Sequence, residues 1–141
     1  MTDNRPPTIA VMSGKGGVGK TTICANLARV LSSAAPTVLV DLDLENRGVT
    51  GLFTAYRDLE DSDVFRALHD PGFPVSPTRI EPNLWVFPSR IGGFEVSRPT
   101  QAASLAGGVA RVVDAIRAAT GAHFVILDCH GGLTGISLAA F

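Results

Sequence analysis

The two lysines of this 141-residue chain lie five residues apart in one glycine-rich segment, whereas its ten arginines are scattered from Arg5 to Arg117. The segment reads Ser-Gly-Lys-Gly-Gly-Val-Gly-Lys-Thr-Thr from Ser13 to Thr22. Glycines let backbone N–H groups turn inward around phosphate oxygens, and a helix that follows adds the positive end of its dipole. The two cations and the glycines together therefore predict a phosphate-binding loop.

The loop fits the pattern G-x-x-x-x-G-K-[ST], with Gly14, Gly19, Lys20 and Thr21 in the fixed places. We expect Lys20 to reach the β- and γ-phosphates of a nucleotide and the Thr21 hydroxyl to ligate Mg²⁺. A glycine-rich turn without any ligand is the alternative, and the full pattern between a strand and a helix argues against it. The other expected nucleotide-binding residues are Lys15, Gly16, Gly17, Val18 and, in the first turn of the helix, Thr22.

Three carboxylates follow apolar runs that are typical of strands. Asp41 and Asp43 are two residues apart, so their side chains point to the same side of an extended chain. An acidic pair at the end of a strand can hold Mg²⁺ through water and orient an attacking water molecule. Asp128 follows residues 124–127 as the aspartate of a Walker B element does, and such an aspartate helps to hold Mg²⁺.

Strands and helices alternate along the chain that positions these residues. Short apolar runs at residues 8–12, 38–40, 84–87 and 124–127 predict four buried strands. Such alternation is typical of an α/β layered fold with a mostly parallel sheet and helices on both faces. The length suits one domain over residues 1–141, with a disordered tail at residues 1–7.

Helical patterns occupy the segments between these strands. The first predicted helix carries an apolar stripe on one face. The last predicted helix runs through residues 105–116 and ends near Gly121. A short helix over residues 64–68 is expected to be capped by Asp61 or Ser62, and the four prolines between residues 71 and 82 predict a loop. Residues 46–56 read as a loop or a short irregular helix. The stripe of the first helix consists of Ile23, Leu27, Val30 and Leu31.

The segment from Gly14 to Thr22 closely resembles the deviant Walker A motif of the ParA/MinD family of ATPases, which have a P-loop NTPase-like fold. In that family the early lysine reaches across a dimer interface to the nucleotide of the partner subunit. The resemblance therefore implies ATP and Mg²⁺ as cofactors, an ATP-dependent homodimer, Lys15 as the lysine acting in the partner and Lys20 as the lysine acting in its own subunit.

The carboxylates take roles by the same resemblance. Asp43 would orient the hydrolytic water and act as a catalytic residue together with Lys15 and Lys20. Asp41 would support the metal shell, and Thr21 and Asp128 would complete the metal site. After Asp128 the family has a small residue and prolines, whereas this chain has Cys129, His130 and two glycines, which could form a second switch.

Members of the family continue for about as long again after the Walker B strand, so we expect this chain to be truncated there. The absent half would carry the segment that selects DNA or a membrane, and a protein partner is expected too. The implied function is an Mg²⁺-dependent ATPase that positions or partitions cargo such as DNA, division machinery or other complexes. A nucleotide-gated interaction module with negligible turnover is one alternative, and a small-molecule kinase or ligase, which would not need Lys15, is another.

Composition argues against several other classes of protein without excluding nucleic acid as a partner. A net charge of −1 with scattered arginines gives no electrostatic footprint for nucleic acid, and no apolar run is long enough to cross a bilayer. The N-terminus lacks the layout of a secretory signal, so we expect a cytoplasmic protein in which Cys24 and Cys129 form no disulfide. Iron–sulfur binding by these thiols is disfavoured. For His130, local hydrogen bonding is favoured over general acid–base chemistry.

Overall fold

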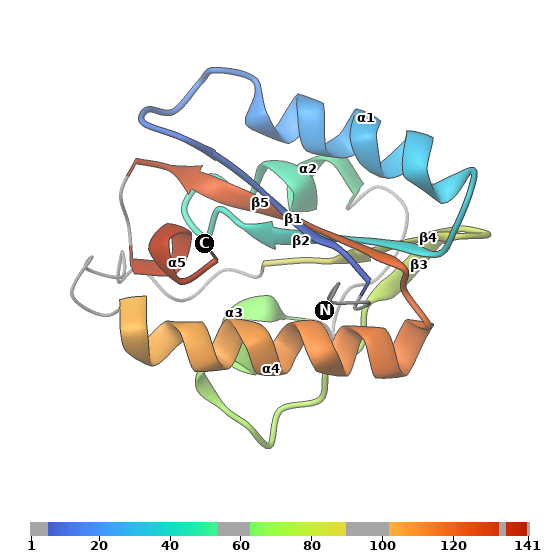
Figure 1. Cartoon of the computed structure of the whole chain (residues 1–141). Coiled ribbons are helices and arrows are strands. Elements are labelled where there is room, and N and C mark those ends of the chain that lie inside the picture. Colours follow the sequence, from blue (N-terminus) through green and yellow to red (C-terminus); the bar gives the residue numbers. More distant parts are fainter. Residues whose placement is uncertain (1–5, 54–62, 90–101, 133–134, 141) are drawn as a thin grey trace, which may run out of the picture.

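A five-stranded, mostly parallel sheet lies at the centre of the protein, as the computed structural model of residues 6–53, 63–89, 102–132 and 135–140 shows (Figure 1). The strand order is β1-β5-β2-β4-β3, and only β3 runs antiparallel to its neighbour. The predicted α/β fold with a mostly parallel sheet is therefore confirmed. The strands are β1 (Thr8–Ser13), β2 (Thr37–Leu42), β3 (Thr78–Glu81), β4 (Leu84–Phe87) and β5 (Phe124–Gly131).

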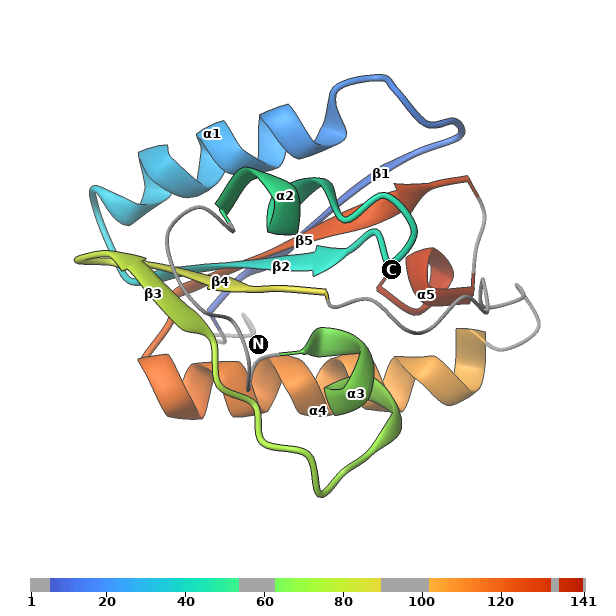
Figure 2. The same cartoon turned by 180° about the vertical axis from the view of Figure 1, so that it is seen from behind.

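Helices cover both faces of the sheet. On one face lie α1 (Lys20–Ser32) and α2 (Gly48–Phe53), and on the other lie α3 (Val64–His69) and α4 (Ala102–Thr120) (Figures 1 and 2). The last helix, α5 (Gly135–Ala139), packs against α4. Within the described segments, none of the helices is long and apolar enough to cross a membrane.

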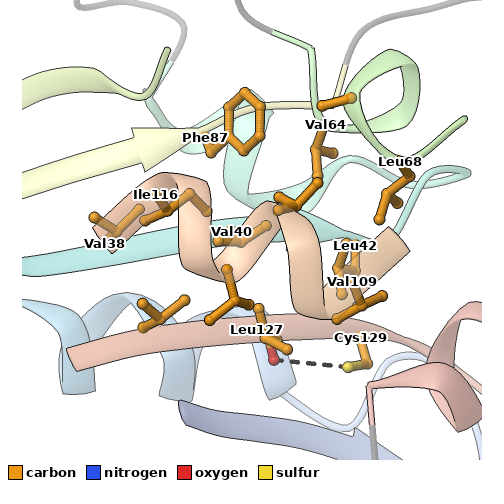
Figure 3. Packing of buried hydrophobic residues seen from close by; sticks show 14 of the residues in the cluster. Val38, Val40, Leu42, Val64, Leu68, Phe87, Val109, Ile116, Leu127 and Cys129 are labelled. Atoms are coloured by element: carbon orange, nitrogen blue, oxygen red, sulfur yellow. Dashed lines mark hydrogen bonds between the residues drawn. The ribbon is translucent and has the colours of Figure 1, made fainter. Parts of the chain in front are cut away.

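The core consists of two apolar clusters, one on each side of the sheet. Val38, Val40 and Leu42 of β2 and Leu127 of β5 face α3 and α4, where they form one cluster with Val109 and Ile116 (Figure 3). The alternate residues of the same strands, such as Leu39 and Ile126, pack beneath α1 and α2. Because side chains alternate along a strand, Asp41 and Asp128 lie on the α1 side of the sheet. This alternation brings the predicted carboxylates to the face from which the phosphate-binding loop enters.

The buried face of α1 differs from the predicted apolar stripe. Ile23 and Val30 are 57% and 67% exposed, whereas Cys24 and Ala28 are fully buried against the sheet. Lys20 and Ser32 continue this buried face at intervals of four residues. The small side chains let the helix lie close to the sheet, and the helix is rotated so that Lys20 turns inward. Apolar periodicity alone therefore selected the wrong face for two of the four residues.

Two predictions about strands were also wrong. β1 is only partly buried, because in the described sheet it is an edge strand with β5 as its single neighbour. The proline-rich segment that was predicted to be a loop contains β3, which lies between Pro77 and Pro82 at the opposite edge. Proline is tolerated where it flanks an edge strand, because no ladder hydrogen bond is lost there.

Two details at chain ends and caps also differ from expectation. Asp63 caps α3 by accepting a hydrogen bond from the Phe65 N–H at 3.1 Å, whereas residues 61 and 62 lie outside the described ranges. Pro6 and Pro7 accept hydrogen bonds from Arg117 and from the backbone of Val125. Residues 6 and 7 of the predicted disordered tail are thus joined to β5 and α4 by hydrogen bonds, and the rest of the tail lies outside the described part.

Candidate functional site

The loop between β1 and α1 has a backbone conformation suited to binding an anion. Gly17 and Gly19 adopt φ angles of 73° and 93°, which favour glycine, and Gly19 caps the N-terminus of α1. The N–H groups of residues 14–19 donate to no acceptor within the described ranges. These donors, together with the helix dipole, are suited to the phosphate-binding role that the sequence predicts for the loop.

The two lysines of the loop have different environments. Lys20 is buried, and its Nζ donates a hydrogen bond to Ser13 Oγ at 3.0 Å, so the ammonium group folds back beneath the loop. The Ser13 hydroxyl in turn donates to the carbonyl of Lys15 at 2.6 Å. Lys15 itself is exposed. The contrast agrees with separate tasks for the two cations, and the sequence pattern did not identify Ser13 as the residue that holds Lys20.

Thr21 and Asp128 meet where α1 crosses the end of β5. The Thr21 hydroxyl donates to Asp128 Oδ2 at 2.7 Å, and the Cys24 thiol donates to Asp128 Oδ1 at 3.5 Å. Burial raises the pKa of Asp128, although the hydrogen bonds from Thr21 and Cys24 oppose this rise. A hydroxyl and a carboxylate oxygen side by side are the hard ligands that Mg²⁺ prefers, so the two residues fit the predicted metal site.

Asp41 lies beside Asp128, because the two are paired in the register of β2 and β5. Its Oδ2 accepts hydrogen bonds from the N–H and the hydroxyl of Thr50 at 2.8 and 2.6 Å, and its Oδ1 accepts from the Asp43 N–H at 3.2 Å. Burial raises the pKa of Asp41 to about 7, although the Thr50 bonds lower it. Asp41 thus attaches α2 to β2, a role that the sequence did not indicate, and only Oδ1 keeps capacity to support a metal shell.

Asp43 lies one step further along the same face. It accepts hydrogen bonds from the backbone and side-chain nitrogens of Asn46 and from His130 Nδ1, the last at 2.9 Å. Burial raises the pKa of Asp43, but the hydrogen bonds from His130 and Asn46 outweigh it and the pKa is lowered overall. Asp43 is therefore an ionised, oriented acceptor. His130 does form a hydrogen bond, as was favoured for this histidine, but its partner lies 87 positions away and is not local in sequence.

β5 extends further than its sequence indicated. The apolar run stops at Leu127, but the strand continues through Asp128 to Gly131, and Gly132 donates its N–H to the Ser13 carbonyl at 2.9 Å. A Cβ on Gly131 would lie 2.5 Å from the backbone nitrogen of Gly16. The first of the two glycines that were expected to flex as a switch is therefore packed directly against the phosphate-binding loop.

A second glycine contact involves the start of α2. A Cβ on Gly48 would lie 2.8 Å from Thr21 Oγ1, so only a glycine permits α2 to begin this close to the candidate metal site. The sequence signal was weak, because an isolated glycine after a polar loop is common. Gly48 and Gly131 show that both loops beyond the strand ends touch the nucleotide-binding segment.

The two cysteines lie in the apolar core. Cys24 and Cys129 are both free and fully buried, and they belong to core clusters on opposite faces of the sheet. Burial, followed by the charge of Asp128, raises the pKa of Cys129 to about 12, and burial raises that of Cys24 as well. Figure 3 shows Cys129 directed into the apolar core beside Leu127. The interpretation of Cys24 as a packing residue is confirmed.

Curated relatives match short parts of the chain. The maintenance of carboxysome distribution protein A of Gloeobacter kilaueensis is 53% identical over 38 residues, which are 27% of this chain and 18% of that protein. The cytosolic Fe-S cluster assembly factor NUBP1 homolog of Caenorhabditis briggsae is 37% identical over 76 residues, which are 54% of this chain and 22% of that protein. This chain thus corresponds to a fraction of each relative.

Solved structures match nearly the whole chain at low identity. A plasmid partition protein from Borrelia burgdorferi has a TM-score of 0.75 and 19% identity, with 96% of this chain and 60% of that chain covered. Cobyrinic acid a,c-diamide synthase from Mycobacterium smegmatis, with a bound ATP analog and magnesium, has a TM-score of 0.72, 24% identity, and 94% and 55% coverage. The septum site-determining protein MinD from Pyrococcus horikoshii, complexed with Mg-ADP, has a TM-score of 0.65, 24% identity, and 94% and 52% coverage.

At these identities the structures establish the fold, and the chain spans between half and two thirds of each of them. The comparison of the sequence with a family model establishes the family as well as the fold. Residues 9–128 match the model of the CobQ/CobB/MinD/ParA nucleotide binding domain, and this range includes the phosphate-binding loop and all three carboxylates of the site. The chain therefore belongs to the CobQ/CobB/MinD/ParA nucleotide-binding domain family, and its loop resembles that of the ParA/MinD members.

Proposed function

We propose that this domain binds ATP together with Mg²⁺ and hydrolyses the bond to the γ-phosphate. In this proposal ATP drives dimerisation, and the dimer serves to position cellular cargo. The observation that carries the proposal is the arrangement where α1 meets β5. The buried Lys20 and the hydrogen-bonded pair of Thr21 and Asp128 lie there, next to the glycine-rich loop. Names of relatives that concern carboxysome distribution, plasmid partition and septum-site determination support the positioning role.

Within this proposal, each group has a separate task. The loop N–H groups and Lys20 bind the phosphates, and they neutralise negative charge that develops during phosphoryl transfer. Asp43 orients the attacking water through its carboxylate, which the lowered pKa keeps ionised. Thr21 and Asp128 would hold Mg²⁺, with support from Asp41, and the ion would supply electrostatic stabilisation of the phosphate oxygens.

The donor set is suited to magnesium more than to a metal held by protein ligands alone. Within the described residues, no group of three or more His, Cys, Asp or Glu side chains could hold a metal ion. Mg²⁺ commonly keeps several waters and is bound by one or two carboxylates plus the phosphates of its substrate. The pair of Thr21 and Asp128 fits that arrangement, and it predicts that magnesium binds tightly only with nucleotide present.

The test is ATP turnover by the purified chain, measured as phosphate release with Mg²⁺ and with a chelator. Lys20→Ala should abolish turnover and weaken ATP binding, whereas Arg66→Ala, which removes a cation on the opposite face of the sheet, should leave both unchanged. Lys15→Ala should keep ATP binding but lose ATP-dependent dimerisation, measured by light scattering after gel filtration. Equal turnover by the wild type and Lys20→Ala would refute the assignment.

The same assay separates two other candidates. One is a nucleotide-gated module, which would dimerise with ATP but release no phosphate. The similarity to cobyrinic acid a,c-diamide synthase favours an ATP-dependent ligase acting on a small molecule. A ligase has no use for Lys15, so turnover and self-association that are unaffected by Lys15→Ala would support it.

A further inference from the structure

His130 stands at a position where the ParA/MinD pattern has no histidine, and its ring lies between two acidic residues of another segment. Its Nδ1 is 2.9 Å from Asp43 Oδ1, and its Nε2 is 3.6 Å from Glu45 Oε2. Only the first distance lies within hydrogen-bonding range. The ring is 20% exposed, so the side chain is largely enclosed.

The strand register explains how the two residues meet. β2 and β5 are paired with Asp41 opposite Asp128 and Leu42 opposite Cys129. One residue further along, Asp43 and His130 face each other on the same side of the sheet as the Asp41–Asp128 pair. The metal-site carboxylates and the Asp43–His130 contact therefore occupy neighbouring positions along one face.

The hydrogen bonds on Asp43 are distributed unequally between its two oxygens. Oδ1 accepts from the Asn46 N–H, from the Asn46 side-chain amide and from His130, whereas within the described residues Oδ2 accepts only from the Asn46 amide at 3.1 Å. A carboxylate oxygen has two lone pairs, so Oδ2 keeps capacity for a further donor such as water. His130 thus helps to occupy Oδ1 and leaves Oδ2 with capacity to accept a hydrogen bond from water.

We propose that His130 is a positioning residue for ATP hydrolysis: its Nδ1–H orients the Asp43 carboxylate and joins the segment after β2 to the end of β5. An ionised carboxylate only accepts hydrogen bonds, so the ring carries its proton on Nδ1. The proposal rests on the proposed function for its consequence in turnover, but the contact itself is independent of nucleotide. Because His130 follows Asp128 by two residues, the contact links Asp43 to the strand that carries the candidate metal ligand.

The first test measures the contact without nucleotide. Long-range ¹H–¹⁵N spectra of the full chain at pH 8.5 should show His130 as the Nδ1-protonated tautomer, and Asp43→Ala should shift its ring nitrogens. His123, which is exposed on the opposite end of β5, serves as the internal reference and should not shift. If His130 is protonated on Nε2, or if its ring nitrogen shifts do not change in Asp43→Ala, the proposal is overturned regardless of the turnover rate.

The second test measures the consequence. His130→Ala should lower kcat roughly 10- to 100-fold, the range expected for one hydrogen bond to a charged group, with ATP affinity unchanged within about twofold. His130→Asn, which keeps a donor near the Nδ1 position, should restore most of the rate, whereas His130→Gln should not, and His123→Ala should behave as the wild type.

A double-mutant comparison separates positioning from general destabilisation. In an Asp43→Ala background, His130→Ala should lower kcat no further, because the residue to be oriented is gone. Equal losses from His130→Ala in both backgrounds, or failure of His130→Asn to restore the rate, would refute the positioning role. If the wild type released no phosphate, the proposed function would fail instead, and the tautomer measurement would still decide whether His130 holds Asp43.

Discussion

Replacing Gly131 with alanine should displace the phosphate-binding loop. The new Cβ would lie 2.5 Å from Gly16 N and 2.7 Å from both Gly16 Cα and the Lys15 carbonyl carbon. All three are backbone atoms of the loop, so no side chain can rotate to relieve the contact. An ordinary contact begins near 3.4 Å, so the loop must retreat by roughly 0.9 Å before the methyl group fits.

A retreat of this size has two expected costs. Overpacking of a close contact typically lowers the free energy of unfolding by about 1–3 kcal/mol. Because a displacement of about 1 Å can cost two orders of magnitude at a precisely shaped site, we expect ATP affinity to fall roughly 10- to 100-fold. The assays are equilibrium titration of a fluorescent ATP analogue and denaturant unfolding of the same sample.

Two other glycines provide matched controls for Gly131→Ala. Gly108→Ala would place a Cβ 2.8 Å from the Leu68 carbonyl, so it should destabilise the contact of α4 with α3 and spare ATP affinity. Gly107→Ala meets nothing within 4 Å in a helix and should raise stability by about 0.5–1 kcal/mol. Wild-type affinity in Gly131→Ala, or an equal loss of affinity in Gly108→Ala, would refute the reasoning.

Three further predictions concern groups around the site and the face of α1. Thr50→Val removes a hydrogen bond that holds the pKa of Asp41 down, so that pKa should rise above 7. The free energy of unfolding should then fall by about 2 kcal/mol at pH 9, where Asp41 is ionised, and by less at pH 5, where Asp41 is protonated. Equal losses at the two pH values, measured by denaturant unfolding, would contradict this. Cys129, buried and with a pKa of about 12, should resist iodoacetamide until the protein unfolds, as mass spectrometry would show. Val30→Lys should change stability by less than about 0.5 kcal/mol, whereas Ala28→Leu should cost about 1–3 kcal/mol, and the reverse order would restore the predicted stripe.

The residues of the candidate phosphate-binding loop were predictable because phosphate binding demands particular residue types at fixed intervals. The loop must have glycines where φ is positive, as at Gly17 and Gly19, and a lysine at the start of the helix. Carboxylates at strand ends were predictable for a similar reason, since parallel strands place their carboxyl ends at one edge of the sheet. These features are local in sequence, so no knowledge of strand order was needed.

The features of the fold and of the candidate site that could not be predicted depend on tertiary contacts. Asp43 and His130 are 87 positions apart and meet only because β5 lies beside β2 in the sheet. The face of α1 was misjudged because Ile23 and Val30 satisfy helical periodicity equally well whether buried or exposed. Close packing on the sheet selected the smaller Cys24 and Ala28 instead. In the same way, β3 escaped prediction because pairing with β4 outweighs the low strand propensity of a proline-rich segment.

The insertion of β5 between β1 and β2 is what assembles the site, and the alternation of its side chains fixes the register. Asp128 faces Thr21 on the α1 side, while Leu127 and Cys129 face the apolar cluster beneath α4. A slip of one residue would exchange these faces, so that the carboxylate would enter the core and a thiol would meet the hydroxyl of the candidate metal site. A carboxylate without polar partners in an apolar core costs several kcal/mol, so the slipped register is strongly disfavoured. The residues that make the site chemically competent therefore also specify the strand pairing that builds it.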